Sequence, residues 1–283
     1  MARYYYLLAS LPDPALPATL KNTSIEEVKE DIERNLTETD RIFFDYLLYP
    51  NDCHNLIQVL FEEEDYRFPA ALELSFVQKP KANRFDFPSF IEKFLEQPEV
   101  APLLNKEREG SNYSKAAATK DLLAYFYEEI RELKQGFIRQ YFSYDHTIKN
   151  MLAAMNSRVY PFDKKWQLLE GEPYAQEISQ SNDENFGLAG IFEHLPKWNE
   201  YMMRNEMDRL EKSIDKAREE QIEHLLKGDA FTSDHVFGYY IKFQLYARWI
   251  PLTNERGKKK LKALIDAYTR EAMKFTELEN INN

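Results

Sequence analysis

Cysteine and glycine are both scarce in this chain of 283 residues, which has one cysteine, Cys53, and 8 glycines. A single cysteine forms no internal disulfide and supplies too few thiolates for a zinc site. We therefore expect a reducing, cytoplasmic compartment and interpret Cys53 as a small buried apolar residue. Few glycines, together with 14% aromatic and 30% charged residues, argue against disorder, collagen and a turn-rich β-sandwich. The composition predicts a packed helical protein.

Long apolar runs and excess positive charge are missing as well. The most apolar stretch, around Tyr239, contains Lys242 and falls short of the roughly 18 uncharged residues of a membrane helix. A net charge of −11 argues against a duplex nucleic-acid partner, since binding to a duplex requires a basic face. We expect no nucleic acid partner, and contact with a membrane only indirectly, through another protein.

Sequence motifs of common catalytic sites do not occur in the chain. G-x-G-x-x-G, G-x-S-x-G and H-E-x-x-H are absent, and Gly257-Lys258-Lys259 lacks the upstream glycine and the hydroxyl of a phosphate-binding loop. Asp145-His146 and Asp234-His235 could be acid–base pairs and Glu62 to Asp65 a cation site, but helix capping and a solvated acidic loop are the simpler interpretations. We expect no enzyme activity, no metal and no cofactor.

The clearest helical pattern begins at Ser233 and Asp234, which are predicted to cap a helix. This helix is apolar on almost every side and is predicted to end before Pro251. A turn that includes Gly257 precedes a second helix, whose apolar residues at helical spacing are Leu261, Leu264, Ile265, Tyr268 and Phe275. Because a helix that is apolar all round must be enclosed by others, we predict that this hairpin is central to an all-α fold.

Capping patterns predict helices in the first part of the chain. Ser24 and Glu27 form a capping-box pattern at the start of a short acidic helix. Asp40 is predicted to cap the next helix, and Asp52 to restart a helix after a break at Pro50 and Asn51. Residues 67–102 contain five prolines and are predicted to form short helices joined by turns. Residues 3–9 fit either a strand or a helical turn.

Two long helices are predicted over residues 115–142 and 198–227, where apolar residues alternate at spacings of three and four. Asp145 is predicted to cap a further helix that ends near Pro161. Residues 171–190, between the two long helices, are polar and bounded by glycines, which predicts a mobile loop or linker.

An aromatic residue followed by an aspartate recurs along the chain, at Asp52, Asp145 and Asp234. Asp145 follows Asp52 by 93 residues, and Asp234 follows Asp145 by 89. This near-equal spacing favours three diverged copies of one helical lobe, although chance recurrence of aspartate caps is the other interpretation. We predict one helical domain over residues 1–283, with lobes at 1–104, 105–190 and 191–283.

Two segments resemble the C-subunit family of V-type ATPases. In the C-terminal segment the matching residues are Ser233, Asp234, Tyr239, Arg248, Trp249, Glu255 and Gly257. In the middle of the chain they are Ser143, Tyr144, Asp145, Ile148, Lys149, Asn150, Leu152, Ala154 and Arg158. The chain looks most like a divergent branch of that family found beside bacterial V-type ATPase subunits. The likeness covers the second half and the extreme N-terminus, whereas the proline-rich opening, residues 11–20, and residues 67–102 match poorly.

The resemblance implies a three-lobed, funnel-like helical protein with long paired helices. Members of that family form a socket between the rotor shaft and the proteolipid ring of the membrane, and transmit torque for ion and proton transport. We therefore predict a non-catalytic central-stalk subunit that is cytoplasmic and peripheral to the inner membrane through its complex; a stand-alone helical adaptor is the alternative. The predicted partner-facing residues are Tyr144, Lys149, Asn150, Arg158, Lys258 and Lys259, and those predicted to be architectural are Tyr239, Arg248 and Trp249.

Overall fold

A computed structural model describes residues 3–15, 20, 22–106, 113–159, 168–169, 171 and 173–249. Every regular element within these ranges is a helix, so the prediction of an all-α fold is confirmed. The N-terminal segment, which fitted either strand or helix, forms helix α1, Tyr5–Ser10. The predicted helix after Gly257, which includes Lys258 and Lys259, lies outside the described residues.

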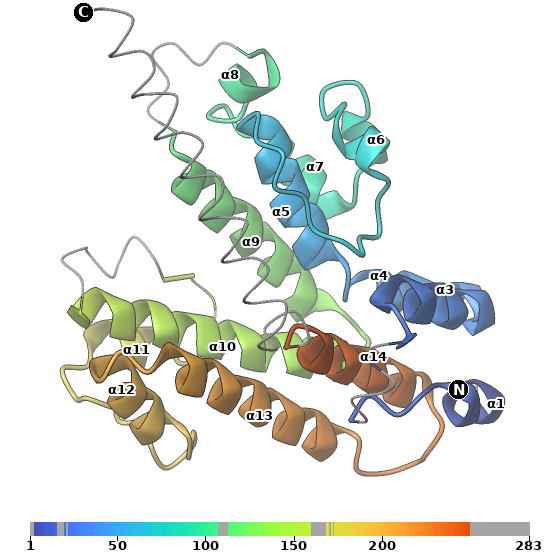
Figure 1. Ribbon diagram of the computed structural model, residues 1–283. Helices are drawn as coiled ribbons and strands as arrows, with labels where there is room; N and C mark the ends of the chain where they lie inside the picture. Colours follow the sequence, from blue (N-terminus) through green and yellow to red (C-terminus); the bar gives the residue numbers. More distant parts are fainter. Residues whose placement is uncertain are drawn as a thin grey trace, which may run out of the picture.

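The first half of the chain forms an arm, in which α5 to α8 lie around one long helix, α9, Lys115–Glu132, while α3 and α4 lie at its base (Figure 1). Helices α5, Tyr49–Leu60, and α7, Ser89–Leu95, pack directly against α9. The remaining elements are α3, Ile25–Asn35; α4, Glu38–Asp45; α6, Leu74–Val77; a 3₁₀ turn, Arg84–Asp86; and α8, Ala101–Leu104. Residues 67–102 thus form short helices joined by turns, as predicted.

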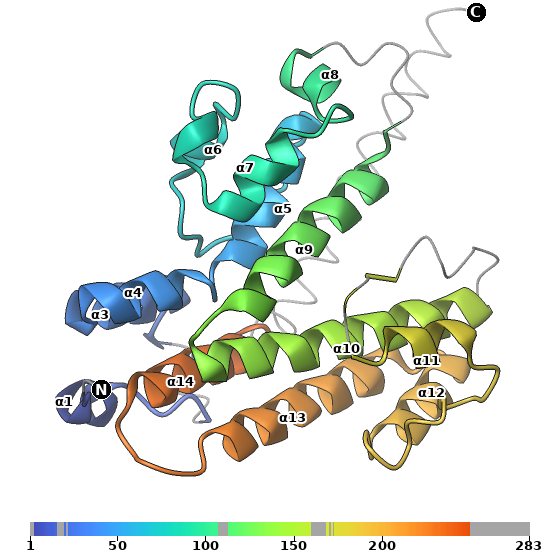
Figure 2. The ribbon, with the colours of Figure 1, turned by 180° about the vertical axis from the view of Figure 1, so that it is seen from behind.

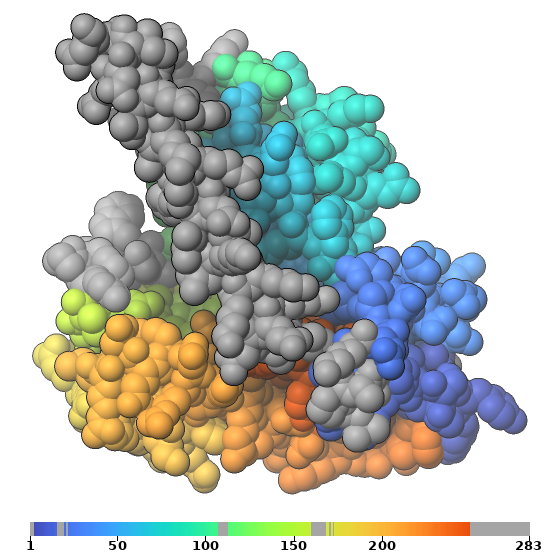
Figure 3. All heavy atoms as spheres, viewed as in Figure 1, coloured from blue at the N-terminus to red at the C-terminus, as the bar shows by residue number. Residues whose placement is uncertain are grey.

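The second half forms a layer in which α10, Gly136–Val159, and α13, Met207–Leu225, lie side by side (Figures 1 and 2). Helices α11, Ala175–Gln180, and α12, Leu195–Met203, cover one end of this layer. Helix α14, Ser233–Ala247, covers the other end and also packs against α3. Figure 3 shows α12 and α13 along one edge of the molecule and the arm with α5 and α6 at the opposite end.

The buried apolar side chains of the described residues form two separate cores. The first core combines the arm with the start of α10, the end of α13 and α14, and the second joins the rest of α10 to α11, α12 and the start of α13. Phe142 and Ile222 belong to the first core, whereas Ile148 and Ala217 belong to the second. The boundary between the two cores therefore crosses α10 and α13 at the same position along the layer. The division into three lobes remains a prediction. The first core contains residues from all three of the predicted lobes.

Helix α14 is enclosed as its all-round apolar pattern predicts. Val236, Phe237, Tyr240 and Phe243 are completely buried, and the Tyr240 ring packs edge-on against Phe44 of α4 at 4.8 Å between centroids. The predicted cap is off by one residue, because the N-cap is Thr232.

The prediction of one helix over residues 115–142 is wrong, because the chain bends between α9 and α10. Leu133 adopts an extended conformation and ends α9. The Gln135 side chain then accepts a hydrogen bond from the Ile138 amide at 2.7 Å, which caps the start of α10. Its amide group donates to Asp234 at 2.5 Å. We call this bend, residues 133–135, the elbow.

The prediction of one helix over residues 198–227 is also wrong, because α12 and α13 are separate. Asn205 has a φ of 56°, a left-handed conformation that asparagine tolerates better than most residues. The Glu206 amide donates to the Tyr201 carbonyl and the Asn205 amide to the Met202 carbonyl. This pair of bonds is a Schellman motif, which ends α12.

Capping side chains in the first half follow the predictions only in part. The Ser24–Glu27 capping box is present with both of its hydrogen bonds. Thr37, however, caps α4 in place of Asp40, whose carboxylate accepts hydrogen bonds from Thr37 and Tyr4. Proline is tolerated in the first helical turn, so Pro50 lies inside α5 without breaking it.

Asp52 lies in the first turn of α5 and does not restart a helix. Its buried carboxylate accepts the Ala71 and Leu72 amides at 2.9 and 3.0 Å, so it holds the following loop against the helix. The prediction of a mobile loop or linker over residues 171–190 is wrong for the described part of this range. That part contains α11 and the buried residues Ile178, Phe186 and Leu188.

Replacing Ser24 by alanine is expected to lower the free energy of unfolding by about 1 kcal/mol, because the capping box loses the side chain that satisfies the Glu27 amide. Urea denaturation measures the change, and Thr23→Ala, one residue outside the cap, is the matched control. Equal stability of the two variants would show that the capping box does not stabilise α3.

Candidate functional site

Charged side chains are buried where the two cores meet. Asp145 is 6% exposed, and its carboxylate accepts from Arg218 Nη2 at 2.7 Å, Arg218 Nε at 3.1 Å and Lys149 Nζ at 2.8 Å. Arg218 reaches it from α13, and Lys149 lies one turn further along α10. Asp145 is therefore an internal residue of α10, and the prediction that it caps a helix is wrong.

Helix α10 continues on both sides of Asp145, with buried apolar residues before and after it. Phe142 and Ile148 are both buried, one in each core. Burial by itself raises the pKa of Asp145, but the positive charges of Lys149 and Arg218 outweigh it and hold that pKa well below its usual range. The pKa of Arg218 is lowered by burial but raised by its interactions with acidic partners, above all Asp145, so its net shift is upward. Both groups are thus charged at neutral pH.

The ion pairs continue from Arg218 to the end of α14. Arg218 Nη1 lies 3.3 Å from Asp215 Oδ1, and Asp215 Oδ2 lies 3.1 Å from Arg248 Nε. The Trp249 indole donates to the same Asp215 oxygen at 2.9 Å, and Arg248 also pairs with Glu211. We call the set Asp145, Lys149, Asp215, Arg218 and Arg248 the ionic junction. It connects α10, α13 and the end of α14.

An aromatic residue of α9 joins the ionic junction to the arm. The Tyr127 hydroxyl donates to Asp145 at 3.1 Å and accepts from Lys149 at 2.7 Å. His146 stacks on the Tyr127 ring, with centroids 4.1 Å apart. Burial raises the pKa of Tyr127 and lowers that of His146 to about 4, so both are neutral at pH 7. The Asp145 carboxylate thus bonds cations and a phenol instead of orienting His146 as an acid–base pair.

The four described residues that were predicted to face a partner all lie on α10, where they hold other parts of the chain. Tyr144 stacks on Phe192 at 5.8 Å, and burial raises its pKa to about 12. Lys149 belongs to the ionic junction. Asn150 is 1% exposed and bonds both the amide and the carbonyl of Leu169 at 2.8 Å, so its side chain supports the fold.

Arg158 fixes the loop before α12. Its guanidinium donates to the carbonyls of Asp183 and Glu184 at 2.8 and 2.7 Å, and it lies over the Phe186 ring at 4.2 Å. The architectural contacts expected of Tyr239, Arg248 and Trp249 are present: the Tyr239 hydroxyl donates to the Pro12 carbonyl, and the other two bond to Asp215.

Three members of the site, Tyr127, Asp215 and Arg218, escaped prediction from the sequence. Arg218 and Asp215 lie among the dense charges of α13, which predict a solvated surface. The one usable signal is their position beside the apolar residues Ile214 and Ala217, at the border of the buried face.

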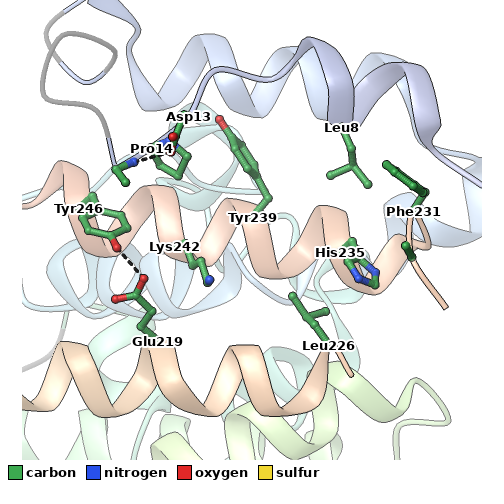
Figure 4. Close-up of a pocket in the computed structure, with 12 residues that line it drawn as sticks. Leu8, Asp13, Pro14, Glu219, Leu226, Phe231, His235, Tyr239, Lys242 and Tyr246 are labelled. Carbon is green, nitrogen blue, oxygen red and sulfur yellow. Dashed lines mark hydrogen bonds between the residues drawn. The ribbon is translucent and has the colours of Figure 1, made fainter. Parts of the chain in front are cut away.

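A pocket of about 440 Å³ lies between α1, the segment Asp13–Ala15, α13 and α14 (Figure 4). Its walls include the apolar side chains of Leu8, Leu226 and Phe231. Its polar groups bond within the chain, since Tyr246 donates to Glu219 and Lys242 pairs with Glu223. The volume suits a small ligand, but the polar groups are already used and indicate no particular chemistry.

The acidic run from Glu62 to Asp65 is exposed, and Glu63 pairs with Lys115 at 2.7 Å. In the part of the chain that the structure describes, no three histidine, cysteine, aspartate or glutamate side chains are placed to hold a metal ion. Over the same residues, no helix combines the length and the apolar character that crossing a membrane requires. Cys53 is buried and has no disulfide partner.

A comparison with family models matches most of the chain. Residues 1–272 match the model of a family described as a protein of unknown function, DUF2764. No curated protein and no solved structure matches the chain.

Asp145→Asn is expected to lower the free energy of unfolding by about 3 kcal/mol, because it leaves the buried Arg218 without its main carboxylate partner. Arg209→Gln is the matched control: it removes an ion pair with Glu206 that is largely exposed and contributes little. Urea denaturation compares the two variants. If both substitutions lower the free energy of unfolding by the same amount, the ionic junction does not stabilise the protein.

The stability provided by Asp145 is expected to depend on pH. Its pKa is lower in the folded than in the unfolded chain, where the ordinary value is 3.8, so the contribution is present above that value and is lost as the pH falls. The difference in unfolding free energy between wild type and Asp145→Asn should therefore shrink as the pH falls from about 4 toward 2. A difference that stays constant over this range would contradict the lowered pKa.

Proposed function

This chain belongs to the DUF2764 family, and we propose that it is a non-catalytic central-stalk subunit of a V-type ATPase or ATP synthase, equivalent in place to the C subunit. In this role it links the rotor shaft to the proteolipid ring and transmits torque, while ATP hydrolysis or synthesis takes place in other subunits. It lies in the cytoplasm and meets the inner membrane through its complex.

The observation that carries the proposal is the meeting of the two segments that resemble the C-subunit family. One contains Asp145 and Lys149, and the other contains Arg248 and Trp249. They are about a hundred residues apart in the chain, yet Arg218 and Asp215 connect them through consecutive ion pairs. Four residues of the likeness, Asp145, Lys149, Arg248 and Trp249, therefore belong to one connected network of ion pairs and hydrogen bonds.

The ionic junction suits a part that carries load. It ties α10, α13 and the end of α14 together, and Tyr127 adds α9. The side chains of Asp145 and Arg218 are largely buried, and salt screens such pairs less than exposed ones. Close packing of the surrounding aromatic residues gives low compressibility. Force applied to the arm thus reaches the α10–α13 layer through contacts that yield little.

The residues considered for catalysis support a structural role instead. A general base operates best with a pKa near the working pH, whereas the pKa of Asp145 is held far below it and burial takes that of His146 to about 4. Neither group is poised to exchange a proton at neutral pH.

Large apolar side chains are exposed at both ends of the molecule. Phe85, in the arm, is 76% exposed, and Met203, at the end of α12, is 74% exposed. Other exposed apolar residues lie elsewhere in the described chain, Tyr6 at 94% among them. Exposed apolar residues mark contact sites when they gather in patches, and single ones do not distinguish a stalk subunit from a stand-alone helical adaptor. Genes for ATPase subunits beside this gene would favour the stalk.

Co-expression with the rotor-shaft subunits and the proteolipid ring of the same organism tests the proposal directly. We expect the chain to co-purify with them and the double variant Lys258→Glu, Lys259→Glu to weaken the complex, because these lysines are predicted to face acidic groups of a partner. The double variant Lys79→Glu, Lys81→Glu is the control of equal charge change. A chain that binds none of these subunits is not a stalk component.

A further inference from the structure

A groove of about 870 Å³ lies along the first half of α9, and it is about twice as large as the pocket in Figure 4. Helices α9 and α10 diverge from the elbow, and the groove lies between them where they have separated (Figure 2). Its apolar lining consists of Ala116, Ala117, Leu123 and Leu169. Apolar surface along a helix is normally covered by another element, so this side of α9 calls for a partner.

Lysines give the groove a positive charge. Lys149 of α10 lies at the end nearest the elbow, where its amine also bonds Tyr127, and Lys115 lies at the opposite end, at the start of α9. Lys120 lies between them, and Glu63 pairs with Lys115. No acidic side chain lines the groove within the described part of the chain. We therefore expect a covering element that is apolar on one face and carries carboxylates toward the start of α9.

The chain leaves the described residues at Trp249, close to one end of this groove. Consecutive hydrogen bonds and ion pairs connect Trp249 to Lys149 in the groove wall, through Asp215, Arg218 and Asp145. The part of the chain that follows Trp249 therefore begins beside the ionic junction, and it is 34 residues long.

This following part has an apolar face of its own. Apolar residues recur in it at helical spacing, and such a face must be buried: Leu261, Leu264, Ile265, Tyr268 and Phe275. As a helix, residues 258–279 would be about 33 Å long. The thirteen residues of α9 from Tyr127 back to Ser114 span about 20 Å, so the segment is long enough to follow the groove from the ionic junction to its far end.

The order of charges along this segment matches that direction. Over residues 258–268 the net charge is +3, and over residues 269–279 it is −1. A segment that starts at the ionic junction and runs along α9 brings its negative part to Lys120 and Lys115, where opposite charges attract.

We propose that residues 258–279 of the same chain occupy this groove as a helix antiparallel to α9. Leu264 and Tyr268 then pack on the apolar lining, and the glutamates of the last part lie beside Lys120 and Lys115. In this position the segment braces the arm against the α10–α13 layer across the opening of the elbow. A second copy of the chain, or another protein, is the other occupant that the experiments distinguish. The proposal does not depend on the stalk function.

Cross-linking of the unmodified full-length chain tests the contact. A carbodiimide joins a lysine amine to a carboxylate only where the two touch, so mass spectrometry should find peptides in which Lys115 or Lys120 is linked to Glu271, Glu277 or Glu279. An equal mixture of unlabelled chains and chains labelled with heavy nitrogen shows whether the linked peptides come from one chain. We expect both peptides of each link to carry the same label.

Hydrogen exchange of α9 provides a second measurement. The double variant Leu264→Asp, Tyr268→Asp places charges on the apolar face of the segment, and we expect the amides of residues 117–123 to exchange about tenfold faster or more. The double variant Ala263→Asp, Ala267→Asp adds the same charge to the opposite face, so it is the matched control and should exchange as wild type does. The amides of α12 should be unchanged in both variants, since this helix belongs to the other core.

Linked peptides that come from two different chains assign the groove to a second copy and overturn the proposal. The absence of any link between α9 and the segment also overturns it, and so does exchange in α9 that the apolar-face variant leaves unchanged. If that variant does not fold, faster exchange throughout the chain reveals it, and cross-linking of the wild type decides alone. Co-purification with ATPase subunits is independent of these results, so failure of the one proposal is distinguishable from failure of the other.

Discussion

The pairing of Asp145 with Arg218 is the interaction on which the arrangement of the second half depends. Each charge would be costly to bury alone, and each lies beside a buried apolar residue, Ile148 on α10 and Ala217 on α13. The pair therefore works only when α10 and α13 lie side by side at one particular level. Apolar packing tolerates sliding of one helix along another better than a buried ion pair does. The pair thus sets the register of the two helices, and the boundary between the two cores falls at that level.

Local signals in the sequence were sufficient for several elements. The Ser24–Glu27 capping box and the enclosed helix over Val236 to Phe243 follow from residues close together in the chain. The breaks at Leu133–Gln135 and at Asn205 were missed, since apolar spacing continues across both and the bonds that end the helices involve single side chains or backbone groups. Periodicity reports which face is buried, and it does not report whether one helix or two present that face.

The candidate site was harder to predict for a different reason. Aspartate is common at helix starts, so Asp145 after an aromatic residue resembled a cap. Its actual partner, Arg218, is 73 residues away on a helix full of charges. Lys149 and Arg248 were singled out by resemblance, and no spacing rule relates either of them to Arg218 or to Tyr127. Long-range ion pairs depend on which helices become neighbours, which local patterns leave open.

Gln135 connects the elbow to a residue that is synthesised much later. Its side chain caps α10 and at the same time bonds Asp234, at the start of α14. Phe44 likewise lacks its ring contact until Tyr240 is synthesised, and the Tyr4 amide lacks its hydrogen-bond acceptor until the Phe231 carbonyl is present. As the chain leaves the ribosome, the arm therefore has α5, α7 and α9 in place but keeps part of its core open to water until residues near 240 emerge. The core of the arm is therefore completed only when α14 packs on it, and contacts between residues so far apart in the chain slow folding.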